Sequence, residues 1–96
     1  MFRSSIEKKL AAVSRELRTI REELQVIEEQ LIQVSDEAED SRLRSLVSET
    51  PLAAQEQRET AKAVAAVRRD REGKIKRLHK LELRQDALLD QLTEAR

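Results

Sequence analysis

The chain has 96 residues, of which 40% are charged and only 1% aromatic, and its 19 lysines and arginines balance 19 aspartates and glutamates. A chain this short forms at most one small domain, and with one glycine and almost no aromatic side chains it lacks the residues that build β-sheets. Because cysteine is absent, disulfides, thiolate metal sites and cysteine nucleophiles are excluded, and we expect a single all-α domain over residues 1–96.

The first half of the chain carries a regular heptad pattern. Leucine recurs every seven residues from Leu10 to Leu31, and isoleucine or valine alternates with it at steps of three and four. This spacing places the aliphatic side chains on one narrow stripe of a helix, which is the pattern of a coiled coil. Glutamate, arginine, lysine and glutamine, all good helix formers, fill most of the positions between them. The pattern predicts a helix over residues 4–48.

The end of this predicted helix is less regular. Its last large aliphatic residues fall on a shifted face, namely Leu43, Leu46 and Val47. Ser35 or Asp36 is a suitable cap for a separate short helix. Two forms of the tip therefore stay open: a turn near 48–51 at the end of one helix, or a kinked or short-helix tip at 35–48 whose aliphatic residues pack on Leu52.

The only proline, Pro51, separates the two halves. Inside a continuous helix a proline clashes with the carbonyl four residues back, which disfavours one helix through this point. At the first position of a new helix its missing N–H does no harm, and the hydroxyl of Thr50 can accept a hydrogen bond from an N–H of the next turn. We expect a second helix to begin here and to run over residues 51–95.

The second half repeats the heptad pattern in a weaker form. Its aliphatic seam residues are Val64, Val67, Leu78, Leu81, Leu88 and Leu92. Arg71, Lys74 and Gln85 interrupt this seam, and Gly73 among them costs about 1 kcal/mol relative to alanine in a helix. The middle of the second helix is therefore expected to be its least stable part.

Antiparallel pairing of the two halves accounts for both patterns. If the numbers of facing residues add up to 98, the seam pairs are Ile6 with Leu92, Leu10 with Leu88, Leu17 with Leu81, Ile20 with Leu78, Leu31 with Val67, and Val34 with Val64. Half of 98 is 49, which places the bend beside the proline. The sequence therefore predicts a long antiparallel two-helix coiled-coil hairpin with a turn near 48–51. A parallel dimer bent at Pro51 does not satisfy this register.

Charges flanking the seam agree with the same register. Residues 1–50 have a net charge of −3 and residues 51–96 a net charge of +3, so the two halves attract each other. The register predicts three flanking ion pairs, Glu16 with Arg84, Glu23 with Arg77, and Glu28 with Arg68. Each exposed pair contributes only about 0–1 kcal/mol, so such pairs fix the register more than the stability.

No group of residues has the chemistry of a catalytic or cofactor site. His79 is the only histidine and has no cysteine or second histidine with which to share a metal, and Gly73, inside a predicted helix, cannot form a glycine-rich phosphate loop. Acid–base catalysis needs a pocket that desolvates a carboxylate, which a two-helix hairpin does not supply. We therefore predict a protein that is not an enzyme, with no catalytic residues, metal, cofactor or small-molecule substrate.

No apolar run approaches the roughly 18 residues of a membrane span, and the first residues lack the apolar core of a signal peptide. We therefore expect a soluble, cytoplasmic protein that does not contact a membrane. An acidic cluster near the predicted tip is a candidate contact for a basic partner; it consists of Asp36, Glu37, Glu39 and Asp40. Its spacing is not that of a calcium loop, and a solvated helix N-terminus, where acidic residues complement the helix dipole, explains it better.

A basic stretch of the second helix, residues 68–84, is a candidate phosphate-binding surface. Its cations are Arg68, Arg69, Arg71, Lys74, Lys76, Arg77, Lys80 and Arg84, against three carboxylates. A basic helix can follow the phosphates of a nucleic acid. Aromatic residues for base stacking are absent from the stretch, and glutamates of the first helix neutralise part of its charge.

Aliphatic residues outside the seam are the third candidate. Val26, Ile32, Ile75 and Leu89 would stay uncovered in a lone hairpin, so two hairpins could pack into a four-helix bundle. These residues predict a non-enzymatic protein–protein interaction module, or small adaptor, that forms a homodimer. The alternative from a different class is a nucleic-acid- or ribosome-associated protein that uses the basic stretch. The residues do not identify the partner.

Overall fold

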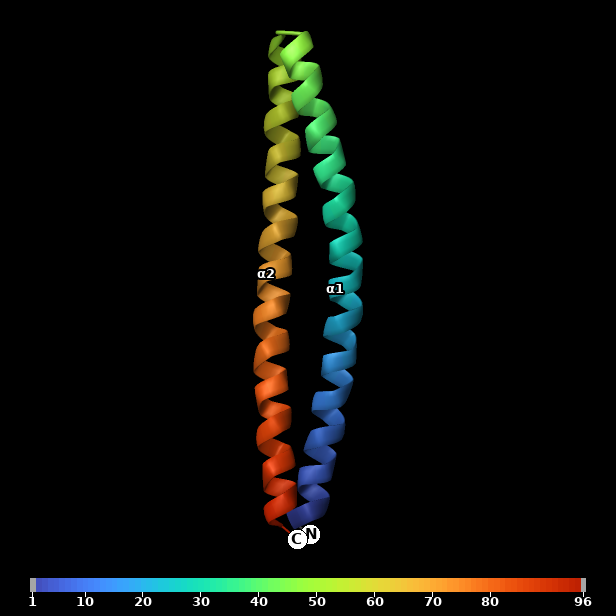
Figure 1. The fold of residues 1–96 in the computed structure, drawn as a ribbon, viewed down its shortest axis with the longest axis vertical. Helices are drawn as coiled ribbons and strands as arrows, with labels where there is room; N and C mark the ends of the chain where they lie inside the picture. The colour runs from blue at the N-terminus through green and yellow to red at the C-terminus, as the bar shows by residue number, and fades with distance from the viewer. Residues whose placement is uncertain (1, 96) are drawn as a thin grey trace. The chain divides into compact units, whose positions relative to one another are not determined.

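A computed structural model describes residues 2–95 and shows an all-α hairpin in which two helices pack antiparallel (Figure 1). Helix α1 spans Phe2–Val47 and helix α2 spans Pro51–Glu94. The predicted antiparallel hairpin is confirmed, and the helix ends lie within two residues of the predicted ones. The chain divides into two compact units. The terminal unit contains Met1–Leu24 and Gly73–Arg96, and the turn unit contains Gln25–Glu72.

The turn between the helices is built as the sequence predicts. The Thr50 hydroxyl accepts a hydrogen bond of 3.1 Å from the backbone N–H of Ala53, so Thr50 is the N-cap of α2. Pro51 occupies the first helical position, where no N–H is needed. At the end of α1, the Ser48 N–H donates to the carbonyl of Arg44 at 2.8 Å. Both helix ends thus satisfy some of their exposed backbone groups locally, and three residues suffice to join them.

The short-helix form of the tip at 35–48 does not occur. Helix α1 continues through this segment to Val47, so Ser35 and Asp36 lie inside the helix and cap nothing. The heptad frame also continues, because inward positions at steps of three and four are occupied by Ala38, Ser41 and Ser45. Opposite them, the inward residues of α2 are Ala53, Ala54, Gln57 and Thr60. The frame is lost in the sequence only when large aliphatic residues alone are counted as seam residues.

Small seam residues near the turn have a physical reason. The distance between two packed helices ranges over about 8–10 Å and is set by the side chains at the contact. A linker of three residues spans at most about 3.3–3.6 Å per residue, so the helices must approach closely where it joins them. Alanine and serine permit that approach, and within the turn unit the helices converge toward the turn (Figure 1).

The terminal unit contains the larger apolar core. Its buried residues are Ile6, Val13, Leu17, Leu81 and Leu88, and the half-buried Leu10, Ile20, Leu78 and Leu92 pack against them. Both members of four predicted seam pairs belong to this cluster, as the register requires. Leu17 and Leu88 are the most deeply buried, with 1% and 0% of their surface exposed. Burial of this seam is what holds the two helix segments of the unit together.

The turn unit has a thinner core. Three aliphatic side chains are buried, Ile27, Val64 and Val67, while Leu31 and Val34 are half-buried. Ser41 is also buried, with 1% of its surface exposed, and its hydroxyl has no hydrogen-bond partner. A desolvated hydroxyl without a hydrogen-bond partner lowers the free energy of unfolding, so Ser41 destabilises the fold.

Polar residues of the α2 seam lie where the sequence predicts, but the ion pairs differ from those expected. In the turn unit Arg71 pairs with Glu28. In the terminal unit Lys74 pairs with Glu23 at 3.0 Å and Arg77 with Glu16 at 2.7 Å. The sequence-based pairs were Glu28 with Arg68, Glu23 with Arg77, and Glu16 with Arg84. All three were wrong.

The physical reason is that cations in the seam compete for the flanking carboxylates. Arg71 and Lys74 occupy half-buried seam positions, and long basic side chains extend from such positions so that the charged end reaches water. These two residues take Glu28 and Glu23, and Arg77 then reaches Glu16. The sequence-based expectation paired flanking residues only with each other, and so missed this competition.

Replacement of the buried Leu88 by alanine should strongly destabilise the fold. Leu88→Ala removes a fully buried side chain and is expected to lower the free energy of unfolding by about 2–5 kcal/mol. Leu52→Ala makes the same chemical change on α2 at a residue that is 66% exposed, and should cost less than about 1 kcal/mol. Urea denaturation followed by circular dichroism measures both; equal losses would contradict the assignment of the core.

Replacement of Ser41 by alanine should stabilise the protein. Ser41→Ala removes the buried, unpartnered hydroxyl and improves helix propensity, so the free energy of unfolding should rise by about 1 kcal/mol. The exposed Ser5→Ala in α1 is the control for propensity and should give a smaller gain. Thermal unfolding compares the two variants. A loss of stability in Ser41→Ala would show that the hydroxyl has a partner in the folded protein.

Candidate functional site

Many large apolar side chains of the described chain face solvent. In the terminal unit they are Phe2, Ile75, Leu83 and Leu89; in the turn unit they are Val26, Ile32, Leu43, Leu46, Val47 and Leu52. Single exposed apolar residues are normal on protein surfaces, but groups of them are characteristic of surfaces that bind a partner. The described part of the turn unit has six exposed large aliphatic residues and three buried ones.

The four off-seam residues singled out in the sequence are all exposed. Val26 and Ile32 of the turn unit are 62% and 66% exposed, and Ile75 and Leu89 of the terminal unit are 38% and 47% exposed. Sequence reasoning missed the exposed residues next to the turn, because one of the two tip forms that it left open packs Leu43, Leu46 and Val47 on Leu52. They can be recognised once the small residues of α1 are counted as part of its seam.

A second stripe with helical spacing runs along the outer face of α1 in the turn unit. We call it the acidic stripe; its residues are Ile32, Asp36, Glu39, Leu43 and Leu46. Steps of four and three place these side chains within about 60–80° of one another around the helix. All five are exposed. The stripe therefore combines aliphatic and acidic side chains on a single face that no other residue of 2–95 covers.

The acidic cluster of the sequence overlaps this stripe. Its members Asp36, Glu37, Glu39 and Asp40 are exposed residues inside α1, about two to three turns before its end, so the interpretation as a helix N-terminus was wrong. Arg42 donates two hydrogen bonds to the carboxylate of Glu39, at 2.7 and 3.1 Å. These bonds, and the charge of the same guanidinium, lower the pKa of Glu39. Within residues 2–95, no cluster of three or more histidine, aspartate or glutamate side chains is arranged to hold a metal ion.

The basic stretch of α2 is partly neutralised. Arg71 and Arg77 contact carboxylates of α1, as does Lys74 between them. Four cations, Arg68, Arg69, Lys80 and Arg84, are exposed and form no ion pair with another described residue. The stretch is also divided between the two units, since residues 68–72 belong to the turn unit and residues 73–84 to the terminal unit. His79 is exposed, as the sequence predicts.

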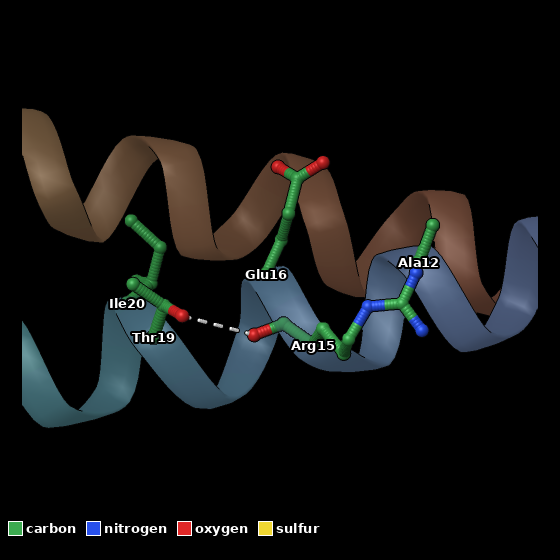
Figure 2. Close-up of a pocket in the computed structure, with 5 residues that line it drawn as sticks. All are labelled: Ala12, Arg15, Glu16, Thr19 and Ile20. Carbon is green, nitrogen blue, oxygen red and sulfur yellow. Dashed lines mark hydrogen bonds between the residues drawn. The ribbon is translucent and has the colours of Figure 1, made fainter.

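The hollows on the surface are shallow. One of about 380 Å³ lies in the terminal unit. Figure 2 shows its lining residues Ala12, Arg15, Glu16, Thr19 and Ile20, which all come from α1. The Thr19 hydroxyl there donates to the Arg15 carbonyl of its own helix at 3.2 Å. A second hollow of about 230 Å³ lies in the turn unit, and its lining includes Ala38, Ala61, Val64 and the ion-paired Arg42 and Glu39. Neither hollow encloses converging polar groups of the kind that orient a small ligand.

Comparisons with known proteins give this chain no relatives: no protein-family model matches it, and neither a curated protein nor a solved structure is significantly similar. Across residues 2–95, neither helix is apolar over a stretch long enough to cross a membrane. The chemistry of the surface is thus the basis for an inference about function.

Proposed function

We propose that this chain is a non-enzymatic protein-interaction module, a small adaptor that self-associates through the exposed aliphatic side chains of its helices. The observation that carries the proposal is the composition of the turn unit, in which more large aliphatic residues face water than are buried. A unit of this kind leaves apolar surface exposed that a partner can bury.

The magnitudes support association over an isolated monomer. Full burial of one valine, leucine or isoleucine contributes about 1.5–3 kcal/mol. Partial burial of six such residues is comparable with the 5–15 kcal/mol that stabilises an average small domain. Association itself costs about 4–15 kcal/mol in lost freedom of motion, so a stable dimer needs contributions from several exposed residues. Two hairpins that pack into a four-helix bundle supply them.

The nucleic-acid alternative has less support. Arg71, Lys74 and Arg77 already contact carboxylates of α1, and the four cations without such partners are distributed over both units. The stretch also lacks aromatic side chains for base stacking. The two functions respond differently to salt, since phosphate contacts weaken steeply as salt rises, whereas apolar contacts do not.

Sedimentation at low and high salt tests the proposal. The protein should form dimers at micromolar concentration that persist in 1 M salt, where charge interactions extend only about 3 Å. Ile32→Asp, which places a charge on a 66%-exposed aliphatic position, should weaken the dimer at least about tenfold. Gln33→Asp adds the same charge at the next residue of α1 and should leave the dimer unchanged.

Two results would contradict self-association. One is a monomer at every concentration. The other is retention on nucleic acid at low salt that disappears when Arg68 and Arg69 are changed to glutamate, in a protein that does not dimerise. The second result would establish the nucleic-acid alternative in its place.

A further inference from the structure

A groove between the two helices runs along one side of the turn unit. The hollow of about 230 Å³ is lined from both helices, by Ala38 and Arg42 on α1 and by Ala61 and Arg68 on α2. All of these residues belong to the turn unit, so the groove is complete within it. Small side chains at such a position let a neighbouring helix approach closely.

Side chains at steps of three and four extend this groove along both helices. On α1 they are Ile32, Ser35, Glu39, Arg42 and Leu46. On α2 they are Ala54, Arg58, Ala61, Ala65 and Arg68. We call these ten residues the groove face. Because this spacing keeps side chains on one side of a helix, the exposed aliphatic side chains of α1 in the set lie beside the hollow and the three alanines of α2 lie across from them.

The two sides of the turn unit differ in charge. The groove face, together with Glu28 and Glu72 at its far end, has three carboxylates and three arginines, a net charge of zero. The opposite side is marked by the Arg44–Glu56 ion pair of 4.0 Å, since Arg44 is turned about 200° from Arg42 around α1. That side has one arginine, Arg44, and five carboxylates, namely Glu37, Asp40, Glu56, Glu59 and Asp70. A two-fold dimer brings the same surface of each copy together, so the opposite side repels its copy and the groove face does not.

We propose that a second copy of the chain occupies this groove, in a two-fold contact in which α1 of each turn unit packs on α2 of the other. This inference rests on the proposed self-association and specifies its surface and its orientation. Packing α1 on α2 keeps neighbouring helices antiparallel, so the four segments form a bundle. The two turns then lie at the same end of the bundle. The contact uses the turn unit alone.

Charge complementarity selects this orientation. The antiparallel register places Glu39 and Arg58 within one helical turn of the same level, so each Glu39 meets Arg58 of the other copy. Arg58 is exposed and forms no ion pair with another described residue of its own chain. If the turns lay at opposite ends with the hollows superposed, α1 would pack on α1 and Arg58 would face Ala65 instead. Opposite charges that meet across an interface fix its register and suppress other pairings.

The aliphatic side chains contribute most of the affinity. In the same register Ile32 lies at the level of Ala65 and Leu46 at the level of Ala54, so each large side chain of one copy meets a small one of the other. Ile32 and Leu46 are 66% and 64% exposed in the isolated chain, and each is covered twice in a two-fold dimer. A face about 33 Å long and two helices wide offers roughly 700 Å² per copy. A stable interface buries about 800 Å² on each partner, which is of the same size.

A charge exchange tests whether Glu39 and Arg58 meet. Glu39→Arg alone and Arg58→Glu alone should each weaken the homodimer about tenfold, because each places like charges opposite one another twice. An equimolar mixture of the two variants should recover most of the wild-type affinity, because both of its contacts pair opposite charges. Arg69→Glu makes the same substitution on an exposed residue outside the groove face and is the matched control. It should leave the dimer unchanged, and its mixture with Glu39→Arg should not restore wild-type affinity.

Spin labels measure the orientation. The chain has no cysteine, so Ser48→Cys beside the turn and Gln30→Cys on α1 each give one exposed labelling site outside the groove face. The distance between labels at 48 in the two copies should be shorter than the distance from 48 in one copy to 30 in the other. Turns at opposite ends would reverse this order.

The outcomes separate this inference from the proposed function. A sedimenting dimer with the reversed order of distances, or with no recovery in the mixture, overturns the groove contact and leaves self-association in place. A chain that remains monomeric at every concentration overturns both, and leaves a helix of a different protein as the occupant of the groove to be sought.

Discussion

Burial of one aliphatic seam between two helices is the interaction on which the rest of the structure depends. In a chain with 40% charged residues, leucine, isoleucine and valine are nearly all of the large apolar material, and without their burial such a composition is typical of disorder. Helix propensity alone does not replace this burial, since most helical stability in proteins comes from packing of an apolar face. Leu17 and Leu88, almost fully buried, mark the centre of the strongest part of the seam.

The seam also explains the form of the turn. Large aliphatic residues on α1 give way to Ala38, Ser41 and Ser45 as the helix approaches its end, and a linker of three residues then connects the helices. The close approach of the two helices also buries the Ser41 hydroxyl without a hydrogen-bond partner, which lowers the stability of the fold. The same change in the seam leaves the neighbouring large residues exposed, and the proposed self-association depends on these residues.

The helices, the antiparallel register and the cap at Thr50 could be predicted from the sequence because each depends on a local or periodic signal. The form of the segment 35–48 could not be predicted, because serine and alanine occur at both buried and exposed positions and identify a seam only when the opposite helix is known. The ion pairs could not either, since Arg71 and Lys74 compete with flanking cations for the same carboxylates. The exposure of Val26 and Ile32 could be predicted from the heptad frame. The exposure of Leu43 and Leu46 could be predicted only from a frame that continues through the small residues near the end of α1.

Each unit combines segments from both halves of the sequence. The account of the exposed surfaces therefore depends on antiparallel packing within one chain, and a distance measurement in the terminal unit tests that packing most directly. Spin labels at Glu7→Cys and Asp90→Cys, both exposed, should lie within about two helix diameters, or ~20–24 Å, of each other. The distance should not change when labelled protein is diluted into an excess of unlabelled chain. Loss of the short distance on dilution would show that the helices pair between chains, and would contradict the hairpin and every inference drawn from it.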